Sequence, residues 1–225
     1  TIWELTMETP LDVPPVIADE LVFIVSRNST VTAVETDTGD TVWSSNIGSP
    51  SFSWVAIDQG NLFVVTNNGL ISGLDAATGV TRWQLATGYR VQAAPAVTED
   101  RLVVATLSRR VLFLNTFTGA MNLVYLTRSA VDGTPAMSGD IAYFAGNDRF
   151  VRAVRVHANN KPLEKTVLKW WAQFWVWGMA PFPPAQSGTV WSHLVGERMN
   201  TSPAVAGEIV VITTQNGTVF GLNAS

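Results

Sequence analysis

The decapeptide LDAATGVTRW, residues 74–83, follows an apolar segment with a Thr-Gly turn and places a tryptophan four residues after the glycine. The same pattern stands 40 residues earlier in VETDTGDTVW, which ends at Trp43. It stands 40 residues later in LNTFTGAMNL, where Leu123 takes the place of the tryptophan. A shorter echo, SGTVW, ends at Trp191. The chain is therefore built from a sequence repeat, and this repeat predicts the fold.

The first unit, residues 15–48, divides into four short strands. Val and Ile dominate PPVIADELVFIVS, and the turn ADE splits this run into two strands. VTAVE alternates as a third strand, and TVWSSNIG follows the Thr-Gly turn as a fourth. In the second unit, Asn67-Asn68-Gly69 predicts a type I′ hairpin turn. Four antiparallel strands in about 40 residues are typical of a propeller blade.

Five such units cover nearly the whole chain, and they predict an all-β propeller of five four-stranded blades. The last unit, ending TVFGLNAS, stops after its third strand, whereas the first residues, TIWELTME, match a fourth strand. We therefore expect the N-terminal strand, with Trp3 at the tryptophan position, to close the ring and remove its exposed edges. The alternative is that residues 1–225 are a fragment of a larger propeller of up to eight blades.

The composition limits the classes of function. Charged residues make up 14% of the chain and the net charge is −4, which argues against a nucleic-acid-binding surface. The absence of cysteine excludes disulfides, thiolate metal sites and cysteine nucleophiles, and it suits an oxidising compartment. No P-loop, Gly-x-Ser-x-Gly, His-Glu-x-x-His or EF-hand motif occurs. The sequence therefore predicts neither an enzyme nor a metal site.

The segments GLDAATGVTRW, AVETDTGDTVW and SPAVAGEIVVITTQNGTVFGLNA resemble the PQQ-like, or quinoprotein-type, propeller repeat family. One branch of that family consists of eight-bladed dehydrogenases that hold pyrroloquinoline quinone and calcium over the central axis. The other consists of BamB-like scaffolds, which are also eight-bladed and carry no cofactor. This chain has fewer units, no cysteine and no cluster of carboxylates and amides that suits calcium.

The resemblance therefore implies a cofactor-free, protein-binding scaffold outside the cytoplasm, in the periplasm or associated with the envelope. The alternative is a quinoprotein-type oxidoreductase, or a sensor that binds a small ligand in the axial funnel. Domain organisation is expected to be simple, with one propeller domain over residues 1–225 and one insertion at about residues 161–186.

The insertion, KPLEKTVLKWWAQFWVWGMAPFPPAQ, replaces a short turn of the fourth unit. Loops on a protein surface are usually polar, yet this one is rich in aromatic residues. Five of them fall within eight positions and are our candidate partner-binding residues: Trp170, Trp171, Phe174, Trp175 and Trp177.

Three interpretations of the insertion stay open. The aromatic side chains fold back over the propeller as a buried lid, or they form an exposed patch that binds a protein partner. In the third interpretation they contact a membrane surface, with Lys165 and Lys169 reaching the lipid headgroups.

The third and fourth units are also rich in arginine. We expect solvated edge charges, with a shared anion site as the alternative, at Arg109, Arg110, Arg128, Arg149, Arg152 and Arg155. The aspartates of the same units, Asp132, Asp140 and Asp148, are expected to serve as turn residues.

Overall fold

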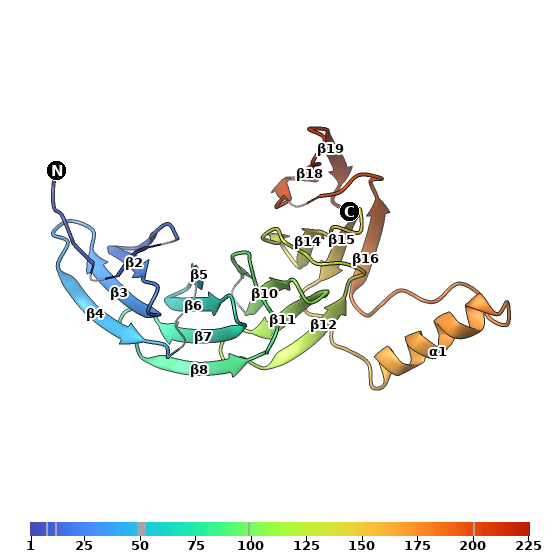
Figure 1. The fold of residues 1–225 in the computed structure, drawn as a ribbon, viewed down its shortest axis with the longest axis horizontal. Coiled ribbons are helices and arrows are strands. Elements are labelled where there is room, and N and C mark those ends of the chain that lie inside the picture. The colour runs from blue at the N-terminus through green and yellow to red at the C-terminus, as the bar shows by residue number, and fades with distance from the viewer. Residues whose placement is uncertain (8, 12, 49–52, 99, 200) are drawn as a thin grey trace.

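The computed structural model describes residues 1–7, 9–11, 13–48, 53–98, 100–199 and 201–225. Five antiparallel sheets follow one another along the described chain and form a curved row (Figure 1). The first sheet contains β1 (Val16–Ala18), β2 (Leu21–Val25), β3 (Thr30–Glu35) and β4 (Thr41–Asn46). The second contains β5 (Ser53–Asp58), β6 (Asn61–Thr66), β7 (Leu70–Asp75) and β8 (Thr81–Ala86).

The remaining sheets follow the same order. The third contains β9 (Ala96–Val97), β10 (Arg101–Thr106), β11 (Arg110–Asn115) and β12 (Met121–Leu126). The fourth contains β13 (Ala136–Ser138), β14 (Ile141–Ala145), β15 (Phe150–Arg155) and β16 (Thr189–Leu194). The fifth has three strands, β17 (Ala204–Ala206), β18 (Ile209–Thr213) and β19 (Val219–Asn223). Each strand pairs with its sequence neighbour, as expected for propeller blades.

Tryptophans at the repeat position join their own segment to the next sheet: Trp43, Trp83 and Trp191 lie on outermost strands, and Trp3 lies in the N-terminal segment. Each indole N–H donates a hydrogen bond to a backbone carbonyl 33 residues further along the chain. These bonds run from Trp3 to Thr36 (2.7 Å), Trp43 to Ala76 (2.9 Å), Trp83 to Thr116 (2.8 Å) and Trp191 to Ala224 (3.2 Å). The repeated tryptophans therefore have a structural role at these positions.

The Thr-Gly turn of the following sheet makes room for the indole ring. Gly79 has a φ of +70°, and a Cβ atom at this position would lie 2.4 Å from the ring of Trp43. Gly119 has the same relation to Trp83. Glycine is thus required at this turn for two reasons: it adopts the positive φ, and it leaves space for the indole ring.

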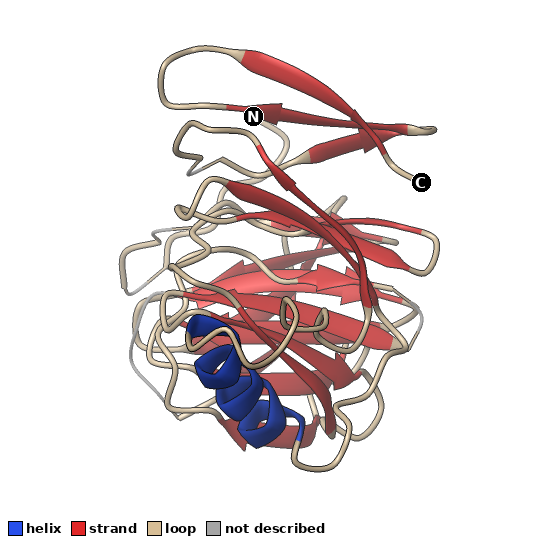
Figure 2. Cartoon of the chain, turned by 90° about the vertical axis from the view of Figure 1, so that its right-hand side faces the viewer, coloured by secondary structure: helices blue, strands red, loops and turns tan. Residues whose placement is uncertain are grey.

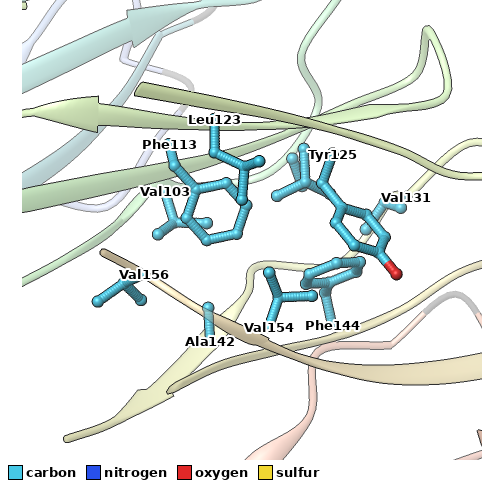
Figure 3. Close-up of a cluster of buried hydrophobic side chains, with 11 residues drawn as sticks. Val103, Phe113, Leu123, Tyr125, Val131, Ala142, Phe144, Val154 and Val156 are labelled. Carbon is cyan, nitrogen blue, oxygen red and sulfur yellow. The ribbon is translucent and has the colours of Figure 1, made fainter. Parts of the chain in front are cut away.

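The junction between the third and fourth sheets is packed differently. Leu123 replaces the tryptophan there, and it is buried with Phe113 in a cluster between the two sheets (Figure 3). In the same cluster the rings of Tyr125 and Phe144 meet edge to face, with their centroids 5.6 Å apart. Aliphatic and aromatic burial therefore replaces the indole–carbonyl contact at this junction.

The expected closure of the ring is not found, because the five sheets form an open arc whose two ends stand apart in Figure 1. The segment 1–7 is not assigned as a strand, and β19 pairs with β18 alone in the described sheet. Trp3 packs against Gly39 of the first sheet, as Trp43 packs against Gly79 of the second.

The hairpin turn at residues 67–69 also differs from the prediction. Gly69 has a positive φ of 87°, but Asn67 and Asn68 do not have positive φ values, so the turn is not type I′. The Gly69 N–H donates to the Thr66 carbonyl (2.9 Å), and the glycine follows the turn in the left-handed region. Non-glycine residues hold this position in other sheets: Ser29, Arg109 and Arg149.

Candidate functional site

The insertion forms one helix that projects away from the arc. The connection from β15 to β16 runs from Val156 to Gly188, whereas the matching turn of the first sheet runs only from Thr36 to Asp40. Within this connection lies α1 (Glu164–Val176), a helix that the sequence interpretation did not specify. Figure 1 shows it pointing outward, and Figure 2 shows it from the side, in front of the sheets.

The base of the insertion is fixed to the outer edge of the third sheet. Asn160 accepts a hydrogen bond from the Val124 N–H (2.8 Å), and Gln186 accepts one from the Leu126 N–H (2.9 Å). The Gln186 amide also donates to the Leu126 carbonyl (2.7 Å). Both ends of the insertion therefore pair with β12 through side chains, much as another strand would pair through its backbone.

Glu164 holds the start of the helix. Its carboxylate accepts hydrogen bonds from the Ser187 N–H (2.5 Å), the Asn160 amide (3.1 Å) and the Lys161 N–H (3.2 Å). Partial burial favours the neutral acid, but these hydrogen bonds outweigh it and lower the pKa of Glu164. The charged carboxylate thus links the segment that enters the insertion to the segment that leaves it.

The interpretation of the insertion as a buried lid is wrong. The helix has no buried residue, and its five candidate aromatic side chains are 36–57% exposed. Beyond the helix, Met179 and Phe182 are 63% and 70% exposed. The aromatic side chains contact one another instead: Trp170 with Phe174, Phe174 with Trp177, and Trp175 with Phe182.

The returning chain stiffens this aromatic surface. The indole N–H of Trp171 donates to the Pro181 carbonyl (3.0 Å), and the rings of Trp175 and Phe182 lie 5.4 Å apart. The second half of the helix and the first residues of the returning chain therefore form a small aromatic platform, which we call the tip (residues 170–182). Its role as a binding site remains a prediction.

Charges are distributed unevenly along the insertion. Lys161, Lys165 and Lys169 lie at four-residue intervals on the half nearest the propeller, and the described part of the chain contains no ion pair that involves them. No Asp, Glu, Lys or Arg occurs between Lys169 and Glu197. The insertion is therefore positively charged where it joins the propeller and uncharged at its aromatic tip.

Across the described residues, no helix combines the length and the apolar character that crossing a bilayer would require.

Two arginines of the third and fourth sheets lie close together, because the guanidinium groups of Arg128 and Arg152 lie 5.5 and 5.1 Å from the ring centroid of Phe150. Arg152 is buried in an ion pair with Asp148, in which both guanidinium nitrogens reach the carboxylate (3.0 and 2.5 Å). Although burial opposes ionisation, Arg152 and backbone N–H groups hold the pKa of Asp148 below its usual value. Arg110 stacks over the ring of Tyr89 (4.6 Å). The expectation of solvated edge charges is thus wrong for Arg152.

His157 bridges two sheets at the foot of the insertion. Its Nδ1 lies 2.5 Å from the Asp140 carboxylate, and its Nε2 lies 3.1 Å from the Asp100 carboxylate. The hydrogen bond with Asp140 raises the pKa of His157 most, and it outweighs the opposing effect of desolvation. Asp140 is a turn residue, as expected, but it also takes part in this contact.

The residues present do not fit pyrroloquinoline quinone with calcium. Calcium prefers several carboxylate and amide oxygens, but the innermost strands are composed of Ala, Val, Ile, Met, Ser and Trp, apart from Asp58. The described residues contain no cluster of three His, Cys, Asp or Glu side chains suited to a metal. A recess of about 720 Å³ in the first sheets is lined by Glu20 and Glu35, which would repel an anionic quinone.

Sequence reasoning identified the aromatic residues but missed the residues that present them. Asn160, Gln186 and Glu164 fix the base, and each looks like an ordinary loop residue in the sequence. Only their position in the sequence could have indicated this role, because they lie where the aromatic segment joins the repeat.

Comparisons with known proteins agree with this architecture. The family model described as "Outer membrane protein assembly factor BamB" matches residues 1–225. The crystal structure of BamB from Moraxella catarrhalis has a TM-score of 0.72 and 21% sequence identity, covering 99% of this chain and 61% of that one. No curated protein matches the sequence significantly.

Two computationally designed proteins are also similar. Ika8 has a TM-score of 0.68 and 16% identity, covering 93% of this chain and 57% of its own. Ika4 has a TM-score of 0.56 and 15% identity, covering 80% of this chain and 96% of its own. At such identities the structures show the fold alone, and the chain spans 61% of the length of the BamB structure.

Proposed function

The chain belongs to the BamB family of PQQ-like propellers, and we propose on this basis that it is a non-catalytic scaffold of the bacterial envelope. The observation that carries the proposal is the insertion. Its aromatic side chains are exposed while its base is fixed to β12 by Asn160 and Gln186. A rigidly presented, uncovered aromatic surface is typical of a binding site.

We propose that the arc holds a protein partner and that the insertion attaches the scaffold to a component of the envelope. The name of the family, outer membrane protein assembly factor, supports a protein partner. Location outside the cytoplasm is part of the same proposal. The family relationship supports it, and the absence of cysteine suits it.

The test compares the wild-type chain with the triple variant Trp170→Ala/Trp175→Ala/Trp177→Ala in cells with a bacterial envelope. We expect the melting temperature to stay unchanged, because none of these side chains is buried, and the fraction retained with isolated envelopes to fall. The control is Val80→Ala/Phe117→Ala/Val219→Ala, which removes exposed apolar side chains from the arc. Equal retention of all three proteins would overturn the role of the insertion.

An enzyme or a sensor with a small ligand in the axial funnel is the competing function. Titration with pyrroloquinoline quinone and calcium, followed by calorimetry, separates the two. We expect no saturable heat, because the innermost strands that the structure describes offer calcium a single carboxylate, that of Asp58. Micromolar binding would replace the scaffold proposal.

A further inference from the structure

We propose that the insertion binds an anionic membrane surface. Its aromatic tip would lie in the lipid interface, and its three lysines would lie at the headgroup phosphates. This rests on the proposed function only in taking the insertion as the binding surface. It names the envelope component that the surface contacts, which is the lipid bilayer itself.

The first reason is that the tip exposes apolar side chains on all sides. Trp170 and Phe174 lie on one side of the helix, and Trp175 lies on another with Phe182 packed against it. Val176 is 70% exposed on the remaining side. A protein groove covers one face of a helix, whereas a lipid phase surrounds an inserted end, so this distribution favours lipid.

The second reason is the charge pattern. The three lysines of the insertion lie toward its base, and the tip contains no charged residue. From Lys169 to Val176, the last residue of α1, the helix rises roughly 10 Å, which is similar to the depth of about 5–10 Å that interfacial helices reach. When the aromatic end is inserted, the lysines therefore stand at the level of the phosphates.

The third reason is the chemistry of the side chains. Tryptophan is favoured at the boundary between lipid tails and water, because its ring is apolar and its N–H can donate a hydrogen bond. Lysine can extend its charged end to the headgroups while its stem stays in apolar surroundings. The three lysines give the insertion a local positive charge in a chain whose net charge is −4, so an anionic surface attracts it.

The experiment is sedimentation of the purified chain with phosphatidylcholine vesicles that contain or lack phosphatidylglycerol. We expect binding to the anionic vesicles, and at least tenfold weaker binding for Trp170→Ala/Trp175→Ala/Trp177→Ala. The variant Lys165→Glu/Lys169→Glu should also bind at least tenfold more weakly, since each lysine near a charged surface contributes a factor of about five. Increasing salt should weaken the wild type and leave this lysine variant little changed.

Two controls match these variants. Val80→Ala/Phe117→Ala/Val219→Ala removes apolar groups from the arc, and Arg90→Glu/Arg198→Glu reverses two exposed charges outside the insertion. Both should bind the anionic vesicles within twofold of the wild type. If they weaken binding as much as the insertion variants do, the contact belongs to the whole surface and the inference is wrong.

The remaining outcomes separate this inference from the proposed function. If the aromatic variant loses envelope retention but the wild type binds no vesicle, a protein covers the tip, and the lipid inference fails while the scaffold proposal stands. If envelope retention does not depend on the insertion, the role proposed for it fails. Equal binding to neutral and anionic vesicles would overturn the contact between lysines and phosphates.

Discussion

The junction between the second and third sheets and the junction between the third and fourth sheets solve the same packing problem differently. At the first, the ring of Trp83 lies on Gly119 and its N–H reaches the Thr116 carbonyl. At the second, Leu123 stands in place of the tryptophan, and the insertion occupies the place of the Thr-Gly turn. The tryptophan and the Thr-Gly turn are thus both absent from this junction, but Gly188, with a φ of +83°, makes room for Leu123, since a Cβ atom there would lie 3.3 Å from the leucine side chain.

The comparison also separates two classes of tryptophan. Those of the repeat pack between sheets and donate to buried carbonyls, whereas those of the insertion are partly exposed and contact Phe174 and Phe182. One residue type therefore holds the arc together in one region and forms a surface in the other.

The largest expected effect on stability comes from replacing one tryptophan of each class by alanine and comparing the two losses. Trp83→Ala should lower the free energy of unfolding by about 3 kcal/mol or more, because it removes a large packed ring and leaves a cavity. Trp170→Ala should change it by about 0.5 kcal/mol or less, since that ring is more than half exposed. Urea unfolding of both variants measures the difference. Similar losses would show that the insertion supports the fold.

The second effect concerns the glycine that the ring needs. Gly79→Ala should cost roughly 2–4 kcal/mol, from its left-handed backbone and from the clash with Trp43. Gly88 is the control, because its φ is also positive (69°) but no atom lies within 4 Å of a Cβ there. Gly88→Ala should therefore cost only about 1 kcal/mol. Equal losses in thermal unfolding would mean that the ring can move aside.

The sequence predicted the strands well, because period, turn residues and Val-rich runs all agree within one repeat. VTAVE is β3, and the run split at ADE is β1 and β2. The number of units was also apparent from the constant spacing of the Thr-Gly turns. Local patterns of this kind determine local structure, and each sheet follows from them.

Local sequence patterns could not predict whether the ring closes or whether the insertion is buried or exposed. Whether five sheets complete a ring depends on the rotation between neighbouring sheets, and no single motif of the sequence encodes that rotation. In the insertion, aromatic density is equally compatible with a buried lid and with an exposed helix. The hydrogen bonds of Asn160 and Gln186 with β12, which hold the helix outward, join residues far apart in the sequence.

A smaller effect is expected in a hairpin of the repeating part. Arg109 is exposed with a φ of 59°, at the position that Gly69 holds in the second sheet. Arg109→Gly should stabilise the chain by about 0.5–1 kcal/mol, because relief of the left-handed strain exceeds the added entropy of the unfolded chain. Arg90→Gly is the control, since Arg90 is exposed and has no positive φ, and it should destabilise slightly. Thermal unfolding of both variants measures the two changes in stability. A loss of stability in Arg109→Gly would contradict the argument.

The smallest effect lies at the junction that lacks the tryptophan, where His157 joins Asp100 of the third sheet to Asp140 of the fourth. The pKa of His157 is raised above 6.5 in the folded chain, chiefly by the hydrogen bond with Asp140. Its contribution to stability is therefore fully present below pH 6.5 and is lost as the pH rises through the raised value. Because His157 is half exposed, the contribution should be about 1 kcal/mol or less.

Melting temperatures of the wild type and of His157→Gln across this pH range measure the effect. The difference between the two proteins should be largest on the acidic side and should shrink as the solution becomes alkaline. Asp140→Asn is the matched variant, because it removes the main cause of the shift and should lower the pKa of His157, as followed by the NMR titration of its ring protons. A difference in melting temperature that grows with pH would reverse the sign of the argument, and the third and fourth sheets would then be held by Leu123 and its neighbours without help from the histidine.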